Sequence, residues 1–176
     1  MGTSPATFST RRLENLSDAI FAFAMTLLVV DLAAPHLTNV YSNHELAGIL
    51  SESGPLLVNF IISFLLLASA WGVHTRQFEH ITRADRHLAF VNNLRLMVVV
   101  LVPFSTSLLN RYPDLTLGTI WLPLNFTLLA ILTTYEWWYA THKRHYYDGL
   151  SDSAIAVAMR RNLVVITISL VITALV

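Results

Sequence analysis

The chain has 176 residues, of which 55% are hydrophobic and 12% are charged, and its mean hydropathy is +0.57. Soluble domains usually carry about 25% charged residues, so this composition indicates an integral membrane protein with the lipid bilayer as its partner. The formal net charge is zero and cysteine is absent. Nothing in the charge indicates a nucleic-acid partner, and disulfides, thiolate metal sites and a cysteine nucleophile are excluded.

The first ten residues are small and polar and lack the apolar core of a signal peptide, so we expect the first apolar segment to be retained. A membrane-spanning helix needs about 20 mostly apolar residues. The sequence therefore predicts an all-α, polytopic membrane protein, one transmembrane domain over residues 1–176 with five helices and a cytoplasmic loop at 141–160. The predicted helices cover residues 16–32, 55–75, 88–110, 117–140 and 162–176. The last is short for a full span, so either it is cut off at the C-terminus or a further segment is missing.

The basic residues alternate between the connections. Two precede the first helix, four lie around the second connection and the start of the third helix, and four lie between the fourth and fifth helices. Ten of the eleven Lys and Arg residues thus fall on one side, and only Arg111 falls on the other. By the positive-inside rule, the N-terminus is predicted to lie in the cytoplasm of a multi-pass protein of the cell membrane. Pro103, in the middle of the third helix, is predicted to kink it.

The first helix has two different faces when it is drawn at about 100° per residue. One apolar stripe carries a single hydroxyl, and its members are Ala19, Phe23, Thr26, Leu27 and Val30. Ser17 and Asp18 both point away from that stripe, near the cytoplasmic end. The pattern indicates that the apolar stripe faces either a pathway or lipid. The face with Ser17 and Asp18 is expected to contact neighbouring helices.

A carboxylate at the edge of the bilayer costs several kcal/mol unless it has a partner. We therefore expect a polar cluster that clamps the first three helices together, made of Arg12, Ser17, Asp18, His74 and Asn92. In the alternative interpretation, Ser17 and Asp18 simply cap the N-terminus of the first helix; both can hold at once.

Two further charged residues lie near the predicted span ends. Arg95 can reach either Glu14 or Glu79, and the sequence does not choose between them. Glu136 is expected to reach water.

Arg12-x-x-x-Leu16-Ser17-Asp18, followed by AIFAFAMTLLVVDL, resembles the Arg-x-x-x-Phe-Ser-Asp signature of the transmembrane protein 175 potassium channels. Trp71-Gly-Val-His74 with Phe78 resembles that family's second helix, and NNLRLMVVVLVPFSTSLL resembles its third. The resemblance covers roughly residues 11 to 112. Leu16 departs from the usual Phe, and five helices are counted where the family has six per repeat.

The resemblance implies a potassium-selective channel, a homotetramer of single repeats whose first helices line the pore. It also implies a ring of bulky apolar side chains as the constriction instead of a carbonyl filter, and a Thr-Val-Gly-Tyr-Gly filter sequence is absent. The ring position is Phe23, followed along the pathway by Thr26, Leu27 and Val30. The family usually has Ile or Leu at the ring, so Phe23 either closes the pore more tightly or offers a cation–π face.

Two polar residues on the first helix each allow two interpretations. The Thr26 hydroxyl either replaces water around a permeating cation or bonds back to its own i−4 carbonyl. Asp31 near the outer mouth either concentrates cations or is an ordinary solvated acid. Potassium enters only as the permeant ion; no cofactor and no metal site are predicted.

The main alternative is a small secondary or proton-coupled transporter that uses Asp18 and His74, which would need both groups to face a water-filled cavity near the midplane. An enzyme is not expected, because no Ser/His/acid set and no His/Glu metal spacing lie at a common depth. A purely structural membrane subunit is the third possibility.

Overall fold

A computed structural model describes residues 9–32, 42–142 and 149–175. The regular elements of these residues are helices. They are α1 (Thr10–Leu27), the 3-10 helix η1 (Leu28–Leu32), α2 (Asn43–Glu52), α3 (Gly54–Phe78), α4 (Arg86–Val100), α5 (Val102–Arg111), α6 (Thr116–Thr119), α7 (Trp121–His142) and α8 (Asp152–Leu175).

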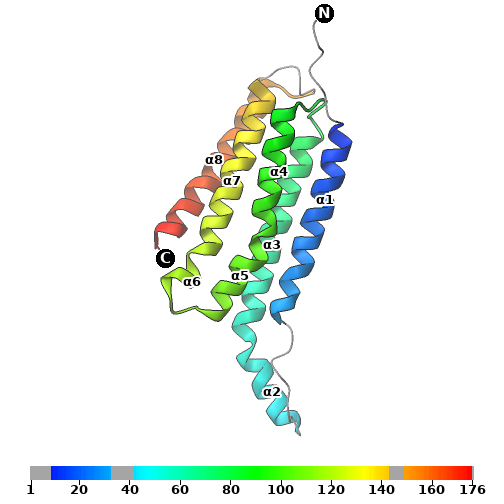
Figure 1. Ribbon diagram of the computed structural model, residues 1–176. Helices are drawn as coiled ribbons and strands as arrows, with labels where there is room; N and C mark the ends of the chain where they lie inside the picture. The colour runs from blue at the N-terminus through cyan, green and yellow to red at the C-terminus, as the bar shows by residue number, and fades with distance from the viewer. Residues whose placement is uncertain (1–8, 33–41, 143–148, 176) are drawn as a thin grey trace, which may run out of the picture.

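Five segments of the described chain are long and apolar enough to cross a membrane, which confirms the predicted number and fold class. They are Thr10–Val30, Gly54–Phe78, Arg86–Arg111, Thr116–His142 and Asp152–Leu175. Figure 1 shows them side by side in one elongated bundle, with α8 at its edge against α7. The starts of α1 and α4 and the ends of α3 and α7 lie together at one end, called here the basic end.

Several predicted boundaries are wrong. The fifth helix starts at Asp152, not at residue 162, so residues 152–160 of the predicted loop 141–160 are helical. The helix has 24 residues, enough for a full span. Its start is marked by Ser151, whose Oγ accepts a hydrogen bond from the Ala154 backbone N–H at 3.3 Å. The first helix likewise begins at Thr10. In both cases the helix begins before the apolar run. Its first turns carry charged residues, so hydropathy alone does not predict them.

A further helix, α2, forms in the connection after the first span, where no helix was predicted. Ser42 caps it, with Oγ accepting from the Glu45 backbone N–H at 3.2 Å, a pattern typical of helix starts. Figure 1 shows α2 extending beyond the bundle at the end opposite the basic end.

The third span is broken where proline predicts a break. α4 ends at Val100, and α5 begins at Val102 with Pro103 in its first turn. Because proline cannot donate a backbone hydrogen bond and clashes with the preceding turn, the span consists of two rods joined at Leu101. The helix is thus interrupted two residues before Pro103, the residue at which a kink is predicted.

The two rods contact their neighbours through different chemistry. On α5, neutral side-chain hydrogen bonds join Thr106 to Ser63 of α3 at 3.0 Å and Ser105 to Asn125 of α7 at 3.0 Å. The apolar core lies beside these polar contacts and is built from residues of η1, α1, α3, α4, α5 and α7. It includes Phe21, Ala24, Leu28, Leu67, Leu96, Val99, Val102, Leu122 and Leu129.

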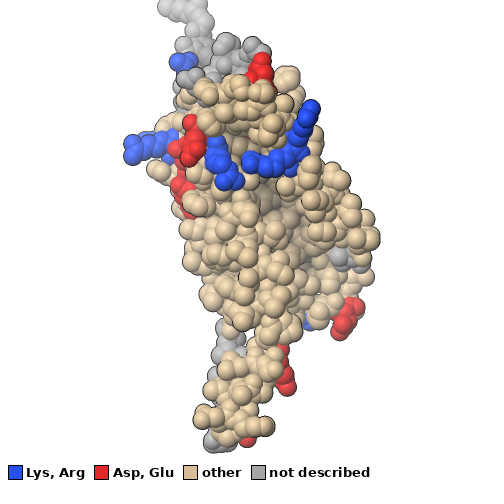
Figure 2. Space-filling view, turned by 180° about the vertical axis from the view of Figure 1, so that it is seen from behind, with Lys and Arg blue, Asp and Glu red and all other residues tan. Residues whose placement is uncertain are grey.

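Charge is distributed unevenly along the bundle. Figure 2 shows Lys and Arg gathered in a band near the basic end, whereas the central part of this face carries almost only uncharged side chains. This is the pattern expected of a protein whose middle lies in hydrocarbon and whose basic end lies at one membrane surface.

Candidate ion pathway and its supporting polar cluster

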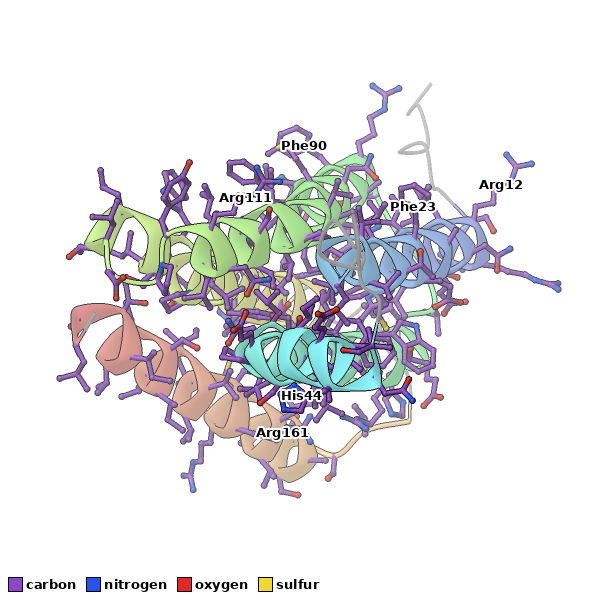
Figure 3. The ribbon with its side chains drawn as sticks, turned by 90° about the horizontal axis from the view of Figure 1, so that it is seen from below. Arg12, Phe23, His44, Phe90, Arg111 and Arg161 are labelled. Carbon is purple, nitrogen blue, oxygen red and sulfur yellow. The ribbon has the colours of Figure 1, made fainter. Side chains whose placement is uncertain are left out.

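The two faces of the first helix have opposite environments. Ser17, Phe21 and Ala24 of α1 are buried against the bundle. The opposite stripe is on the surface of the single chain: Phe23 and Val30 are each 61% exposed, Ala19 and Thr26 are exposed, and Leu27 is half-buried. Figure 3 shows Phe23 on the side of the bundle away from α8. The predicted stripe is therefore one surface, which residues 9–32, 42–142 and 149–175 leave largely uncovered.

Thr26 uses only part of its hydrogen-bonding capacity. Its Oγ1 donates to the backbone carbonyl of Phe23 at 2.7 Å, which is the i−3 carbonyl and not the expected i−4 one. A hydroxyl has one hydrogen but two acceptor lone pairs, so the Thr26 oxygen still has acceptor capacity on the exposed face. The side chain of Asp31 lies outside the described residues.

On the buried face, Ser17 is the point where α1 meets the polar interior. It is 0% exposed, and its Oγ donates to the Leu13 carbonyl at 2.8 Å and lies 3.4 Å from the Asn92 side chain. Asn92 Oδ1 in turn accepts a hydrogen bond from Arg95 Nη2 at 2.7 Å. The same Arg95 nitrogen lies 2.5 Å from His74 Nδ1. The structure thus brings Ser17, His74 and Asn92 together, with Arg95 between them.

His74 also has an aromatic environment. Its ring centroid is 6.1 Å from that of Phe21 and 4.3 Å from that of Phe78. Since an arginine can only donate, His74 Nδ1 accepts, and the ring is neutral with its proton on Nε2. This ring connects α3 to both α1 and α4.

Arg95 and Glu136 form a buried ion pair that the sequence interpretation missed. Arg95 Nε lies 3.3 Å from Glu136 Oε2, and the two side chains are 0% and 1% exposed. The predicted partners of Arg95, Glu14 and Glu79, are wrong, as is the prediction that Glu136 reaches water. Because α4 begins at Arg86, Arg95 is almost three turns into the helix and faces α7 in place of the membrane surface.

We call Ser17, His74, Asn92, Arg95 and Glu136 the buried polar cluster. It joins α1, α3, α4 and α7, the four helices that surround it. The sequence pattern of a single helix does not predict this cluster, because its members come from four helices whose packing the sequence does not specify.

Asp18 and Arg12, expected in this cluster, lie outside it on the surface. Asp18 Oδ1 accepts a hydrogen bond from Trp71 Nε1 at 2.8 Å, so its partner is on α3. The reason is rotational: successive helical residues differ by about 100°, so Ser17 and Asp18 cannot both face the interior. The capping alternative is also wrong, since α1 starts at Thr10 and Ser17 lies in its interior.

Within the described residues there is no group of three or more His, Asp or Glu side chains placed to hold a metal ion. The chemistry of this region is therefore that of an apolar surface stripe with one hydroxyl, held in position by a buried ionic network.

We expect Glu136→Leu to lower the free energy of unfolding by about 3–5 kcal/mol, because Arg95 then stays charged and buried without its counterion. The double change Arg95→Met/Glu136→Leu is expected to recover most of that loss. Thermal unfolding of the purified protein in detergent measures both. Glu79→Gln, at an exposed position after α3, is the control and should change little. An equal loss in the single and double variants would contradict a coupled pair.

Comparison with known proteins agrees with this geometry. The family model described as endosomal/lysosomal potassium channel TMEM175 matches residues 12–103. A Streptomyces collinus protein named as a potassium channel is 31% identical over 153 residues, which is 85% of this chain and 73% of that protein.

The crystal structure of a lysosomal potassium-selective channel TMEM175 homolog from Chamaesiphon minutus has a TM-score of 0.78 to this chain at 28% identity. The match covers 94% of this chain and 85% of the Chamaesiphon chain. The rat protein named endosomal/lysosomal proton channel TMEM175 is 26% identical over 112 residues, 64% of this chain but 22% of that protein. The resemblance found in the signature is confirmed: the chain belongs to the TMEM175 family of potassium channels, a family of ion channels and not of enzymes.

Proposed function

We propose that the protein is a potassium-selective cation channel in which the α1 helices of four copies line one central pore. The observation that carries this proposal is the exposed stripe of α1, formed by Ala19, Phe23, Thr26 and Val30, directly opposite a face that is packed into the bundle. The names of the Streptomyces and Chamaesiphon relatives, a potassium channel and a potassium-selective channel, support potassium as the ion.

The pathway requires several copies, because one exposed helix face encloses nothing by itself. Around a rotation axis, the same stripe repeated from each subunit forms a closed ring. Figure 3 shows Phe90 of α4 on the same side of the bundle as Phe23, and Phe90 is 66% exposed. This side thus offers an apolar surface on α4 next to the α1 stripe, where a neighbouring subunit would pack.

The constriction we propose is a ring of Phe23 side chains. An apolar ring excludes ions by dewetting and conducts when it widens. One turn further, the Thr26 oxygens retain the acceptor capacity to replace part of the water around a cation. Leu27 and Val30 continue the wall, and Asp31 follows at the outer mouth, where acidic groups raise the local cation concentration.

The buried polar cluster has a positioning role in this mechanism. Ser17 lies 3.4 Å from Asn92 of α4, and Phe21 stacks beside His74 of α3, so these contacts set the rotation of α1 from its rear face. A helix rotated by one residue, about 100°, would turn Phe23 out of the stripe.

The transporter alternative receives less support. It needs Asp18 and His74 in one water-filled cavity. Asp18 instead bonds Trp71 at the surface, and His74 is 1% exposed between Phe21 and Phe78. These two groups face different environments, so they do not form one transport site in the described conformation.

Planar-bilayer recording tests the channel. With K⁺ and Na⁺ on opposite sides, we expect unitary currents whose reversal potential follows the K⁺ equilibrium potential. Phe23→Ala should raise conductance or open fraction severalfold, because a smaller apolar side chain widens and wets the ring.

The matched control is Phe64→Ala on α3, an exposed phenylalanine on another helix, which should leave the currents unchanged. A reversal potential that ignores K⁺ removes the selectivity assignment. Identical currents from wild type and Phe23→Ala place Phe23 against lipid.

We further propose that the basic end faces the cytoplasm of a cell-membrane protein. Because the chain lacks cysteine, single cysteines report orientation without background. A membrane-impermeant maleimide should label His44→Cys on α2 in intact cells, and Glu79→Cys only after permeabilisation. Both positions are exposed. The reverse pattern would invert the topology.

A further inference from the structure

A cavity of about 250 Å³ lies between α3, α7 and α8, on helices that take no part in the proposed pore. Its wall is almost entirely apolar, and it includes Ala70, Val73, Phe126, Ala130, Thr133 and Val165. The one hydroxyl among these six, on Thr133, is already bonded to the Leu129 carbonyl at 2.8 Å. The α8 helix is the least buried of the five spans, so this cavity lies near the outer surface of the described bundle.

One polar side chain lines this cavity at the end nearer the basic end, and two more buried polar side chains follow its lining rows one turn further along α3 and α7. Asn162 of α8 lines it, is 7% exposed, and its Nδ2 has no hydrogen-bond partner among the described residues. Gln77 is 5% exposed with neither amide atom bonded, and Trp137 is 2% exposed with Nε1 unbonded. Gln77 follows Val73 by one helical turn and Trp137 follows Thr133 by one turn, so both continue the lining rows.

These groups form an incomplete hydrogen-bonding site. Buried donors without partners each cost about 1–3 kcal/mol, and here the amides of Asn162 and Gln77 and the indole of Trp137 offer donors that an acceptor oxygen would satisfy. A hydrocarbon chain alone fits the apolar wall but not these donors. The occupant must therefore combine an apolar chain with a neutral or anionic oxygen at one end.

Basic side chains lie at this level of the helices. Arg76 directly precedes Gln77 on α3 and Arg161 directly precedes Asn162 on α8, and both arginines are exposed. Figure 2 shows the band of Lys and Arg at this level, and Figure 3 shows Arg161 on the α8 side of the bundle, away from Phe23. Charge outside the cavity thus complements a phosphate.

We propose that the cavity binds one acyl chain of an anionic glycerophospholipid from the surrounding bilayer. Part of the chain lies along the apolar wall, the ester carbonyl accepts hydrogen bonds from Asn162, Gln77 or Trp137, and the phosphate rests outside near Arg76 and Arg161. The volume of about 250 Å³ is below the range of about 300–1,000 Å³ for pockets that enclose a whole ligand, so the cavity takes a part of one chain and not a whole lipid. Depth agrees as well: Trp137 lies five residues, about 8 Å, before the end of α7, near the membrane interface.

Native mass spectrometry of the full-length protein in detergent tests this binding. Dioleoyl phosphatidylglycerol is added, with dioleoyl phosphatidylcholine and free oleate in separate arms. We expect phosphatidylglycerol to be retained about tenfold more strongly than phosphatidylcholine, at one molecule per subunit. Equal retention of the two lipids overturns the anionic headgroup assignment, and retention of oleate alone overturns the phospholipid.

Two neighbouring substitutions locate the lipid. Val165→Phe places a ring at the cavity wall, whereas Val164→Phe adds the same ring one residue away, outside the lining. Retention should fall about tenfold in the first and stay unchanged in the second.

Asn162→Leu tests the polar end without adding bulk and should weaken retention about tenfold, because it removes the amide donor. If Val165→Phe does not fold, Asn162→Leu decides alone. Retention that is unchanged in both Val165→Phe and Asn162→Leu places the lipid elsewhere and overturns the proposal. Bilayer currents are not the readout, so failure here is distinguishable from failure of the channel proposal.

Discussion

The contact on which the arrangement depends is the ion pair between Arg95 and Glu136. A guanidinium and a carboxylate, both fully buried, connect α4 to α7 within a membrane-spanning bundle. Charges in that environment are tolerated only with close partners, so the helices that supply those partners have little freedom to move apart. Arg95 also bonds Asn92 and His74, so one guanidinium fixes the relative positions of several helices. The fixed position of these helices matters most for α1, which packs against them.

Because Ser17 and Phe21 meet the cluster, the opposite side of α1 is oriented without any contact of its own. The two faces of α1 therefore differ in chemistry: hydrogen-bonding and aromatic contacts lie at the rear, and an apolar stripe with one hydroxyl lies at the front. In the proposed pore, this division keeps the contacts that position α1 away from the ion.

The spans, the break near Pro103 and the stripe of α1 could be predicted because each follows from local pattern: apolar run length, proline chemistry and helical angle. The start of α8 was missed although Ser151 marks it, because charged and polar residues before the apolar run were taken for loop. The pairing of Glu136 with Arg95 does not follow from the sequence. The two residues are 41 positions apart on consecutive spans, and no periodicity says which side chains of two neighbouring spans face each other. Asp18 was misplaced by a single residue step, which in a helix is enough to move a side chain from the interior to the surface.

The break at Leu101 divides the third span into two rods with different bonding. The rod towards the basic end, α4, is secured by a full charge and its hydrogen bonds, whereas α5 is held to α3 and α7 by neutral hydroxyl and amide contacts, each worth about 1 kcal/mol. The ionic contact of this span is therefore confined to the half nearer the basic end. A change of angle at Leu101 would exchange only the neutral hydrogen bonds of α5 and would leave the ion pair of α4 in place.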